Sequence, residues 1–316
     1  MIELPPAAGA GGSSTSEHGP SSVPASDAEE YLSLGAPIRG PSALTDDWRR
    51  FWYLTYTIAR NEFKLKFFGS ALGYVWQLMR PLLLFGVLYV VFTRVVKTGG
   101  TAKHFPAILL ADVVMFTFFI EATAGSVRSV VDRESLVRKI QFPRMVIPLS
   151  VVLLALFNLS LNLIVVGIFV VAAQGVSPHL SWLELPLILL FLVVFATGVS
   201  MLLSALFVRF RDVQPIWDVV GQVLFYGSPV IYPIEKVAGL HGGPFGIPWI
   251  HLYMVNPLAF AFEQFRHAII DSGAPSAFQA IGGWPESLIP LGLVAGLFVV
   301  GFVVFNRSAP EIAEHL

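Results

Sequence analysis

The sequence predicts an all-α integral membrane protein, on the evidence of its composition and its long apolar runs. Hydrophobic residues occupy 55% of the 316 positions, charged residues only 13%, and the mean hydropathy is +0.71. This composition leaves too little polar surface to cover a water-soluble fold of this length. Several apolar runs approach the ~20 residues that a helix needs to cross a bilayer. We therefore expect a chain that crosses the membrane several times.

Six transmembrane helices are expected within a membrane domain that spans residues 69–307. Their approximate limits are residues 71–96, 105–127, 146–173, 185–208, 214–232 and 288–305. Residues 1–44 are rich in Gly, Ser, Ala and Pro without apolar periodicity, so a disordered cytoplasmic tail is expected there. No basic and apolar leader opens the sequence, so no cleaved signal peptide is expected. Residues 308–316 are expected to form a cytoplasmic C-terminus.

Residues 45–68 predict an amphipathic helix that lies at the membrane surface. At ~100° per residue, apolar and aromatic positions gather on one stripe. Its members are Trp48, Trp52, Tyr56, Ala59, Phe63 and Phe67, widened by Phe51, Leu54, Ile58 and Leu65. Polar residues, Arg60 and Lys64 among them, occupy the opposite arc. Such a helix suits the interface, and Gly69 and Gly73 permit a sharp turn into the bilayer.

Basic residues predict that both termini face the cytoplasm. Fourteen of them fall on one side of the predicted spans: Arg39, Arg49, Arg50, Arg60, Lys64, Lys66, Arg128, Arg133, Arg138, Lys139, Arg144, Arg209, Arg211 and Arg307. The other side holds only Arg94, Lys97, Lys103, Lys236 and Arg266. Cytoplasmic loops carry the excess of Lys and Arg, so we expect a multi-pass protein of the cytoplasmic membrane with this orientation.

Several chemistries are not expected in this chain. It has no Cys, which excludes disulfides, thiol nucleophiles and Cys-ligated metals. No Gly-x-x-x-x-Gly-Lys-Ser/Thr string occurs, so the chain has no P-loop for ATP. The net charge of −1 gives no footprint for nucleic acid. We expect no catalytic residue, no metal site and no cofactor. A membrane-embedded glycosyl- or acyl-transferase is an alternative, but it needs clustered acids or a His beside an acid, and the seven His are scattered.

Charged side chains within the predicted spans point to positions that avoid lipid. Asp112 and Glu121 interrupt the second span, Arg80 lies in the first, and Asp218 lies near the inner end of the fifth. A charge at the centre of a bilayer costs about 2.5–3.5 kcal/mol on insertion scales. Glu121 should therefore face protein or water, whereas Arg80 has a stem long enough to snorkel to the interface.

Four motifs carry a family resemblance that covers roughly Arg60 to Arg307. They are the basic and aromatic run from Arg60 to Gln77 with Pro81 and Tyr89-Val90-Val91-Phe92, the string from Leu136 to Arg144 with Pro148, the string Arg209-Phe210-Arg211-Asp212-Val213, and Ser228-Pro229 through Tyr232-Pro233. Together they resemble polysaccharide and polyol-phosphate exporter permeases of the type-two ABC superfamily, the transmembrane subunits for export of O-antigen, teichoic acid or galactan.

The resemblance implies a homodimer that moves a polyprenyl-pyrophosphate-linked polysaccharide outward. ATP and Mg would be bound by a separate ABC nucleotide-binding subunit, present in two copies. A drug or small-lipid exporter of the same superfamily is an alternative that shares the fold. For the pyrophosphate, the candidates are Arg60, Lys64 and Arg80, because a guanidinium binds such a dianion in a bidentate manner.

The charged loop at about 131–142 is the candidate contact with the ATPase. Asp132 could cap a short helix that Pro143 ends, with Leu136 and Ile140 on one side. The resemblance places the coupling helix here. The implied coupling residues are Asp132, Glu134, Leu136, Arg138, Lys139, Ile140 and Phe142. The alternative is an ordinary connector whose charges satisfy the positive-inside rule.

The fifth span and the segment after it supply the remaining candidates. Gly, Pro and amides in the span suit an aqueous path, and aromatic faces suit sugars, which favours Trp217, Gln222, Phe225, Tyr226 and Ser228 as channel lining. The resemblance adds Trp76, Phe85 and Tyr89; the alternative is an interfacial aromatic belt. Within the extracellular segment at about 234–287, Asn256 as N-cap and Pro257 at N1 start a helix too short to span. The resemblance implies short extracellular gate helices there, including Phe260 and Phe262, and a plain surface loop is the alternative.

Overall fold

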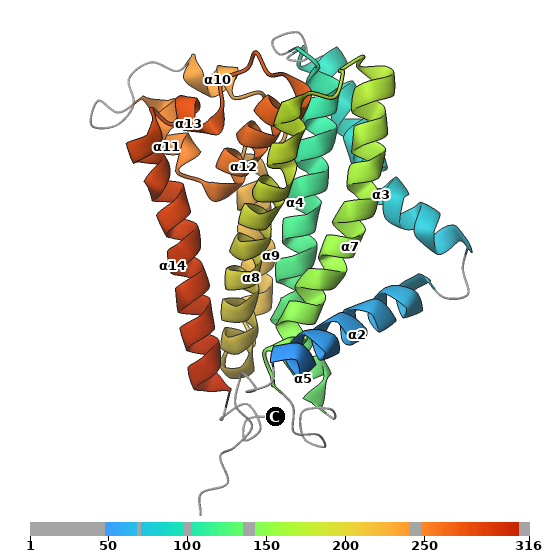
Figure 1. Cartoon of the computed structure of the whole chain (residues 1–316), viewed down its shortest axis with the longest axis vertical. Helices are drawn as coiled ribbons and strands as arrows, with labels where there is room; N and C mark the ends of the chain where they lie inside the picture. Colours follow the sequence, from blue (N-terminus) through green and yellow to red (C-terminus); the bar gives the residue numbers. More distant parts are fainter. Residues whose placement is uncertain (1–47, 68–70, 98–102, 135–142, 240–247, 310–316) are drawn as a thin grey trace, which may run out of the picture. The chain divides into compact units, whose positions relative to one another are not determined.

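The computed structural model describes residues 48–67, 71–97, 103–134, 143–239 and 248–309. All of them lie in one compact unit, residues 41–316. Every regular element in these ranges is helical, which confirms the all-α class (Figure 1). The elements are α2 (Trp48–Phe67), α3 (Ala71–Val90), η1 (Val91–Val95), α4 (Phe105–Val127), α5 (Ser129–Asp132), α7 (Val146–Ile168), η2 (Phe169–Ala173), η3 (Leu180–Glu184), α8 (Leu185–Arg209), α9 (Val213–Gly227), α10 (Glu235–Ala238), α11 (Trp249–Met254), α12 (Pro257–Phe265), η5 (Arg266–Ile270), α13 (Ala277–Ala280) and α14 (Trp284–Ser308).

Five of the described helical segments are long and apolar enough to cross a membrane. They are Val75–Val95, Phe105–Val127, Val146–Ala173, Leu180–Arg209 and Trp284–Ser308. The predicted fifth span at 214–232 is instead the 15-residue α9, which ends at Gly227. At 1.5 Å per residue this helix covers about 22 Å, which is less than the ~30 Å hydrocarbon core. The structure thus supports a multi-pass membrane protein, and the count of six spans stays a prediction.

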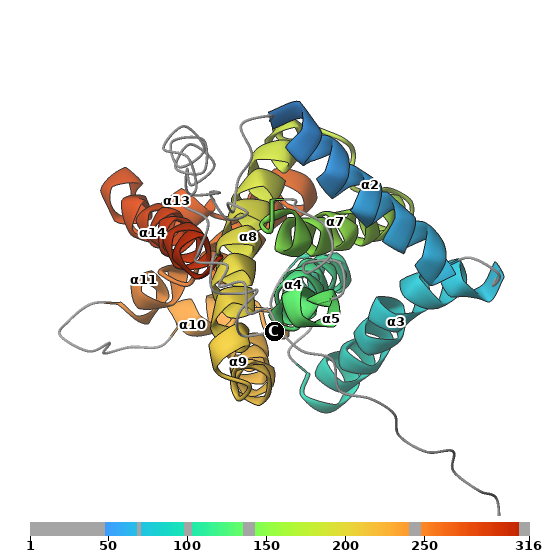
Figure 2. The ribbon, with the colours of Figure 1, turned by 90° about the horizontal axis from the view of Figure 1, so that it is seen from below.

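Helix α4 occupies the centre of the bundle. It packs against α3, α7, α8, α9 and α12, and Figure 2 shows it between α3, α7, α8 and α9. Within its apolar window 78% of the residues are buried, against 11% for the window in α3. Asp112 and Glu121 favour this position, because charged side chains within a span face protein or water rather than lipid.

Helix α2 lies crosswise to the long helices and packs on α7 (Figure 1). Its protein-facing edge consists of Phe51, Thr55 and Ala59, each at most 2% exposed. Trp48 and Trp52, which belong to the predicted aromatic stripe, are 61% and 44% exposed. This edge of small and apolar residues therefore fixes the helix to the bundle. The exposed Trp48 and Trp52 can contact the membrane–water interface.

The helices α10 to α13 form the end of the bundle opposite α2, which we call the outer end because the charge pattern predicts it outside (Figure 1). They enclose a small apolar cluster that includes Ile234, Met254, Phe260 and Ile281. The segment at 234–287 is therefore packed helical structure in its described part, rather than the plain surface loop of the alternative interpretation.

The contact between α8 and α14 depends on two glycines. A Cβ at Gly301 would lie 2.2 Å from the backbone oxygen of Gly198, and a Cβ at Gly198 would lie 2.7 Å from the Cα of Phe298. Both neighbours are backbone atoms, so no side-chain rotation can relieve the overlap. The two helices can approach this closely only because both positions lack a side chain.

We predict that Gly301→Ala destabilises the protein by separating α14 from α8. Overpacking of this kind costs about 1–3 kcal/mol. The measurement is the thermal unfolding midpoint of the purified protein in detergent. Gly296→Ala is the matched control, because the Cβ there meets nothing within 4 Å. Equal midpoints for the two variants would contradict the close approach.

Candidate functional site

A groove of about 600 Å³ lies between α3, α4 and α9. Helix α9 supplies Trp217, Gln222, Phe225 and Tyr226, all four of which the sequence predicts as channel lining. The remaining lining residues are Leu84 from α3, Phe116, Ile120 and Ala124 from α4, and Asp218 and Gly221 from α9. Aromatic rings, one amide and one carboxylate thus face a common space.

The walls of the groove are held by specific contacts. The indole Nε1 of Trp217 donates to the hydroxyl of Thr123 at 3.1 Å, and that hydroxyl in turn donates to the backbone oxygen of Phe119 at 2.7 Å. Phe225 meets Phe116 edge to face, with ring centroids 5.1 Å apart. A Cβ at Gly221 would lie 3.1 Å from the Cδ1 of Ile120, so this glycine lets α9 approach α4 closely.

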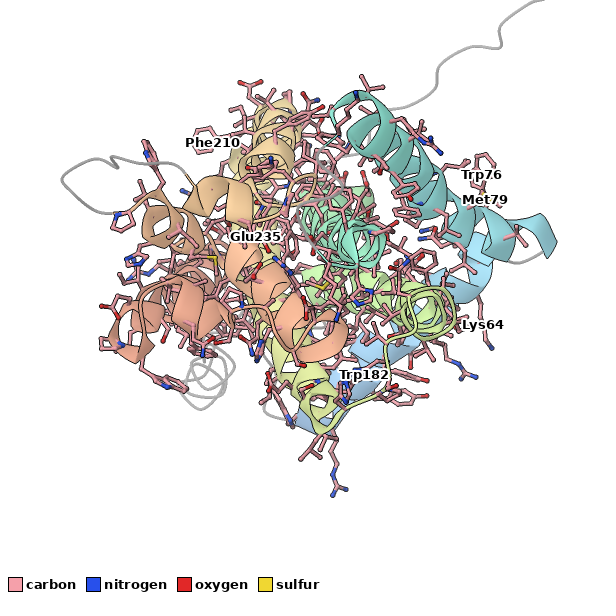
Figure 3. All side chains as sticks on the ribbon, turned by 90° about the horizontal axis from the view of Figure 1, so that it is seen from above. Lys64, Trp76, Met79, Trp182, Phe210 and Glu235 are labelled. Carbon is pink, nitrogen blue, oxygen red and sulfur yellow. The ribbon has the colours of Figure 1, made fainter. Side chains whose placement is uncertain are left out.

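The other predicted lining residues lie elsewhere in the chain. Trp76 is 60% exposed and lies at the periphery, as does Lys64 (Figure 3). Phe85 and Tyr89 stack on each other at 5.7 Å and pack against the central core, where Phe85 also contacts Phe169. Ser228 is fully buried beyond the end of α9. Trp76, Phe85, Tyr89 and Ser228 do not line the groove of the single chain. A role for these four in transport stays a prediction.

Asn256 joins the start of α12 to the end of α9. As predicted, it is the N-cap: its Oδ1 accepts from the Leu258 backbone N–H at 3.0 Å, and Pro257 follows at N1. Its Nδ2 donates to the Ser228 hydroxyl at 2.8 Å. Phe260 and Phe262 are 4% and 1% exposed and pack in the core, and a gating role for them stays a prediction. The Asn256 oxygen thus caps α12 while its nitrogen bonds Ser228, and the residue connects the end of α9 to the outer segment.

A buried ionic cluster fixes the outer segment, and no sequence pattern predicted it. Arg266 is 3% exposed and donates to both carboxylate oxygens of Glu235, and it lies 3.5 Å from the Oε1 of Glu263. Asp112 of α4 is buried nearby, within electrostatic range of Arg266 and Glu263. The pKa of Glu263 is raised to about 7 in total: burial raises it most, Arg266 lowers it, and the charge of Glu235 raises it.

A polar cavity of about 620 Å³ lies at the inner end, between α2, α3, α4, α5 and α7. As predicted, Glu121 faces protein and this cavity: it accepts from the Gln77 amide at 3.1 Å and from the Asn158 amide at 3.0 Å. Of the three predicted pyrophosphate residues, only Arg80 lines the cavity. Arg60 and Lys64 are exposed on α2.

The same cavity contains charged residues that the sequence did not predict as site residues. Glu62 and Lys66 of α2 line it, together with Arg133, whose guanidinium pairs with Glu62. Glu62 and Arg133 are 71 positions apart, so no local pattern could indicate their contact. The ion pair connects the interfacial helix to the segment that follows α5.

The predicted coupling loop is described only in its first residues. Asp132 ends α5 and makes an ion pair with Arg128 at 3.7 Å, and the helix that it is predicted to cap lies outside the described residues. Glu134 is half-buried. The other predicted coupling residues lie outside the described residues: Leu136, Arg138, Lys139, Ile140 and Phe142.

Long apolar helices around a buried central helix, with polar groups gathered at a groove and at the two ends, define a multi-pass membrane protein. Residues 53–270 match the ABC-2 type transporter family, which is more than half of the chain. The chain therefore belongs to the ABC-2 type transporter family. Membership identifies a transport subunit in a membrane and implies an ABC nucleotide-binding partner.

Proteins of similar length are similar in sequence to most of this chain. The O-antigen export system permease protein RfbA of Klebsiella pneumoniae is 29% identical over 266 residues, which is 83% of this chain and 95% of that protein. A second protein of that name and organism is 27% identical over the same shares. The protein of that name from Myxococcus xanthus is 29% identical over 267 residues, again 83% and 95% of the two chains.

We predict that the stability of the outer segment falls as pH rises from about 4.5 to about 7. The folded state holds the Glu263 proton more tightly than the unfolded state does. The contribution of this proton to the free energy of unfolding is therefore complete at low pH and is lost as pH passes the raised pKa. Glu263→Gln should flatten this part of the profile of melting temperature against pH. Asp212→Asn, an exposed carboxylate at the inner end, should leave the profile unchanged. An unaltered profile for Glu263→Gln would contradict the assignment.

Proposed function

We propose that this chain is the transmembrane subunit of an ATP-driven exporter that moves a polyprenyl-pyrophosphate-linked polysaccharide out across the cytoplasmic membrane. The relatives named for O-antigen export support a polysaccharide as cargo. O-antigen, galactan and teichoic-acid precursors all have the required chemistry. Both termini are cytoplasmic in this proposal, and the outer end faces the exterior.

The groove between α3, α4 and α9 is the observation that carries the proposal. Sugars present C–H faces that pack on aromatic rings, and they carry hydroxyls that need donors and acceptors. The groove offers both kinds of partner, since Phe225 and Tyr226 lie beside Gln222 and Asp218. Tyr226 is 64% exposed although it lies on a helix of a membrane protein, as expected for a side chain that meets cargo rather than core.

A second copy of the chain would close the groove on its open side. Apolar side chains of α3 and α9 that do not line the groove are exposed in the single chain, including Val87 at 62% and Val223 at 64%. A two-fold dimer is the commonest closed assembly, and it would cover these surfaces while two grooves join into one conduit. Trp76 would meet the partner copy in such an arrangement.

The inner polar cavity is the proposed position of the pyrophosphate. Arg80 lines it, and in the described part of the chain this guanidinium makes no ion pair or hydrogen bond. A guanidinium can bind two phosphate oxygens at once, which a lysine cannot. Arg60 and Lys64, exposed on the interfacial helix, would attract the anionic head group toward the cavity.

Helix α4 is the proposed route by which the partner acts on the groove. One face of α4 forms a groove wall through Phe116 and Ile120, and α5 and the coupling segment at 131–142 follow directly after its end. Two copies of the nucleotide-binding subunit would hold ATP and Mg and press on this segment. The hydrogen bond that the Asn256 amide donates to Ser228 would transmit a movement of α9 to α12 and open the outer gate.

We predict that Tyr226→Ala combined with Gln222→Ala lowers export about fivefold, as the loss of ~1 kcal/mol of contact with the cargo would. The measurement is the amount of lipid-linked glycan that reaches the outer face of cells that lack the native chain. Complex formation with the ATPase and ATP hydrolysis should persist. Ile164→Ala on α7, 61% exposed and outside the groove, is the matched control. Unchanged export by the double variant would overturn the groove as conduit.

A further inference from the structure

A second pocket, of about 590 Å³, lies at the outer end between α8, α12, η5, α13 and α14. It shares no residue with the groove. Phe191, Phe260, Phe278 and Trp284 form a chain of neighbouring rings along it, with centroid distances of 5.7, 5.2 and 4.4 Å. The export path described above leaves this pocket unused.

The position of the pocket corresponds to the outer leaflet. Glu184 directly precedes α8 and Trp284 begins α14, so both mark the outer end of a span. Phe191 and Leu291, which also line the pocket, each lie seven residues further along the chain, or about 10 Å deeper. Leu187 at its edge is 67% exposed on the lipid-facing side. The pocket therefore extends from the head-group level into the upper acyl chains and opens to lipid.

Two polar side chains that line the pocket, Glu184 and His267, offer free acceptors. The Oε2 of Glu184 accepts from the Gln264 amide at 2.6 Å, and no described residue donates to its Oε1. The Nδ1 of His267 lies 2.7 Å from the backbone oxygen of Ala274. Because that oxygen can only accept, Nδ1 carries a proton, and in the neutral ring Nε2 is left as an acceptor. One carboxylate oxygen and one imidazole nitrogen thus remain available.

This set of groups discriminates between ligands. No Lys or Arg lines the pocket in the described part of the chain, so an anionic group would find no counter-charge. An ammonium group would meet a carboxylate and several aromatic faces, which attract cations. A primary ammonium also has three N–H donors for Glu184 and His267, whereas a quaternary ammonium has none.

We propose that this pocket binds an outer-leaflet phospholipid through its primary-ammonium head group, with phosphatidylethanolamine as the matching chemistry. The ammonium donates to Glu184 and His267 beside the ring of Trp284, the phosphate stays at the aqueous surface, and one acyl chain lies along Ile188 and Leu291. The bound lipid fills the space between α8 and α14 at their outer ends. It thereby braces α12 and α13, the helices of the outer segment, against α14.

The test is native mass spectrometry of the purified, delipidated full-length protein with three synthetic lipids that have identical acyl chains. The wild-type chain should retain phosphatidylethanolamine in preference to phosphatidylcholine and phosphatidylglycerol. Glu184→Gln should weaken phosphatidylethanolamine binding about tenfold, the order expected for a hydrogen bond to a charged group, and should leave the other two lipids unchanged. Glu286→Gln, a carboxylate in the first turn of α14 that does not line the pocket, is the matched control and should bind as wild type.

A second variant, Trp284→Leu, keeps the proposal testable if Glu184→Gln does not fold. Trp284 is 71% exposed, so its replacement should leave the melting temperature nearly unchanged while it lowers the preference for phosphatidylethanolamine. Equal retention of the three lipids by wild type, or wild-type preference in both variants, would overturn the proposal. Displacement of phosphatidylethanolamine by an equal amount of a neutral diglycosyl lipid would also overturn it, because the pocket would then recognise sugar rather than an ammonium group.

Discussion

The burial of α4 on every side is the constraint on which the rest of the structure depends. Helix α4 carries Asp112 and Glu121, whose charges are costly in contact with lipid, and α7 and α8 cover most of its surface. Helices α3, α9 and α12 contact the remaining surface of α4, and α3 and α9 leave an open space between them. The groove is thus a consequence of how the core is closed. Helix α9 presents an amide, Gln222, and a carboxylate, Asp218, to this groove.

Polar groups that enter the bundle are satisfied in pairs across helices, and each pair ties one functional region to the core. Glu121 is held by amides from α3 and α7, Trp217 by a hydroxyl of α4, and Asn256 by Ser228. Buried polar groups without partners are expensive, so these contacts position the inner cavity, the groove and the outer segment relative to α4. In the proposed exporter, these contacts would transmit a displacement of α4 or α9 to both ends of the bundle.

Local patterns in the sequence predicted those features that depend on one segment. The span at 105–127, the helix start at Asn256 and Pro257, and a protein-facing Glu121 follow from hydropathy, capping and the cost of a charge in lipid, and the structure confirms them. Features that join distant segments could not be predicted. The contact between Glu184 and Gln264 spans 80 positions, and Phe85 and Tyr89 pack against the core because η2 lies beside them. The short α9 was missed because apolar residues continue past Gly227 in irregular structure.

Hydration of the groove is the central claim, and the natural absence of Cys allows a direct measurement. Single cysteines at Gln222 and Ala124 in the groove, and at Ile164 and Leu190 on exposed faces of α7 and α8, would be introduced into the chain assembled with its ATPase in proteoliposomes. A charged, membrane-impermeant maleimide reacts with thiolate, which forms only where water reaches the sulfur. The account predicts rapid labelling at Gln222→Cys and Ala124→Cys and slow labelling at Ile164→Cys and Leu190→Cys. Equally slow labelling at all four positions would contradict it.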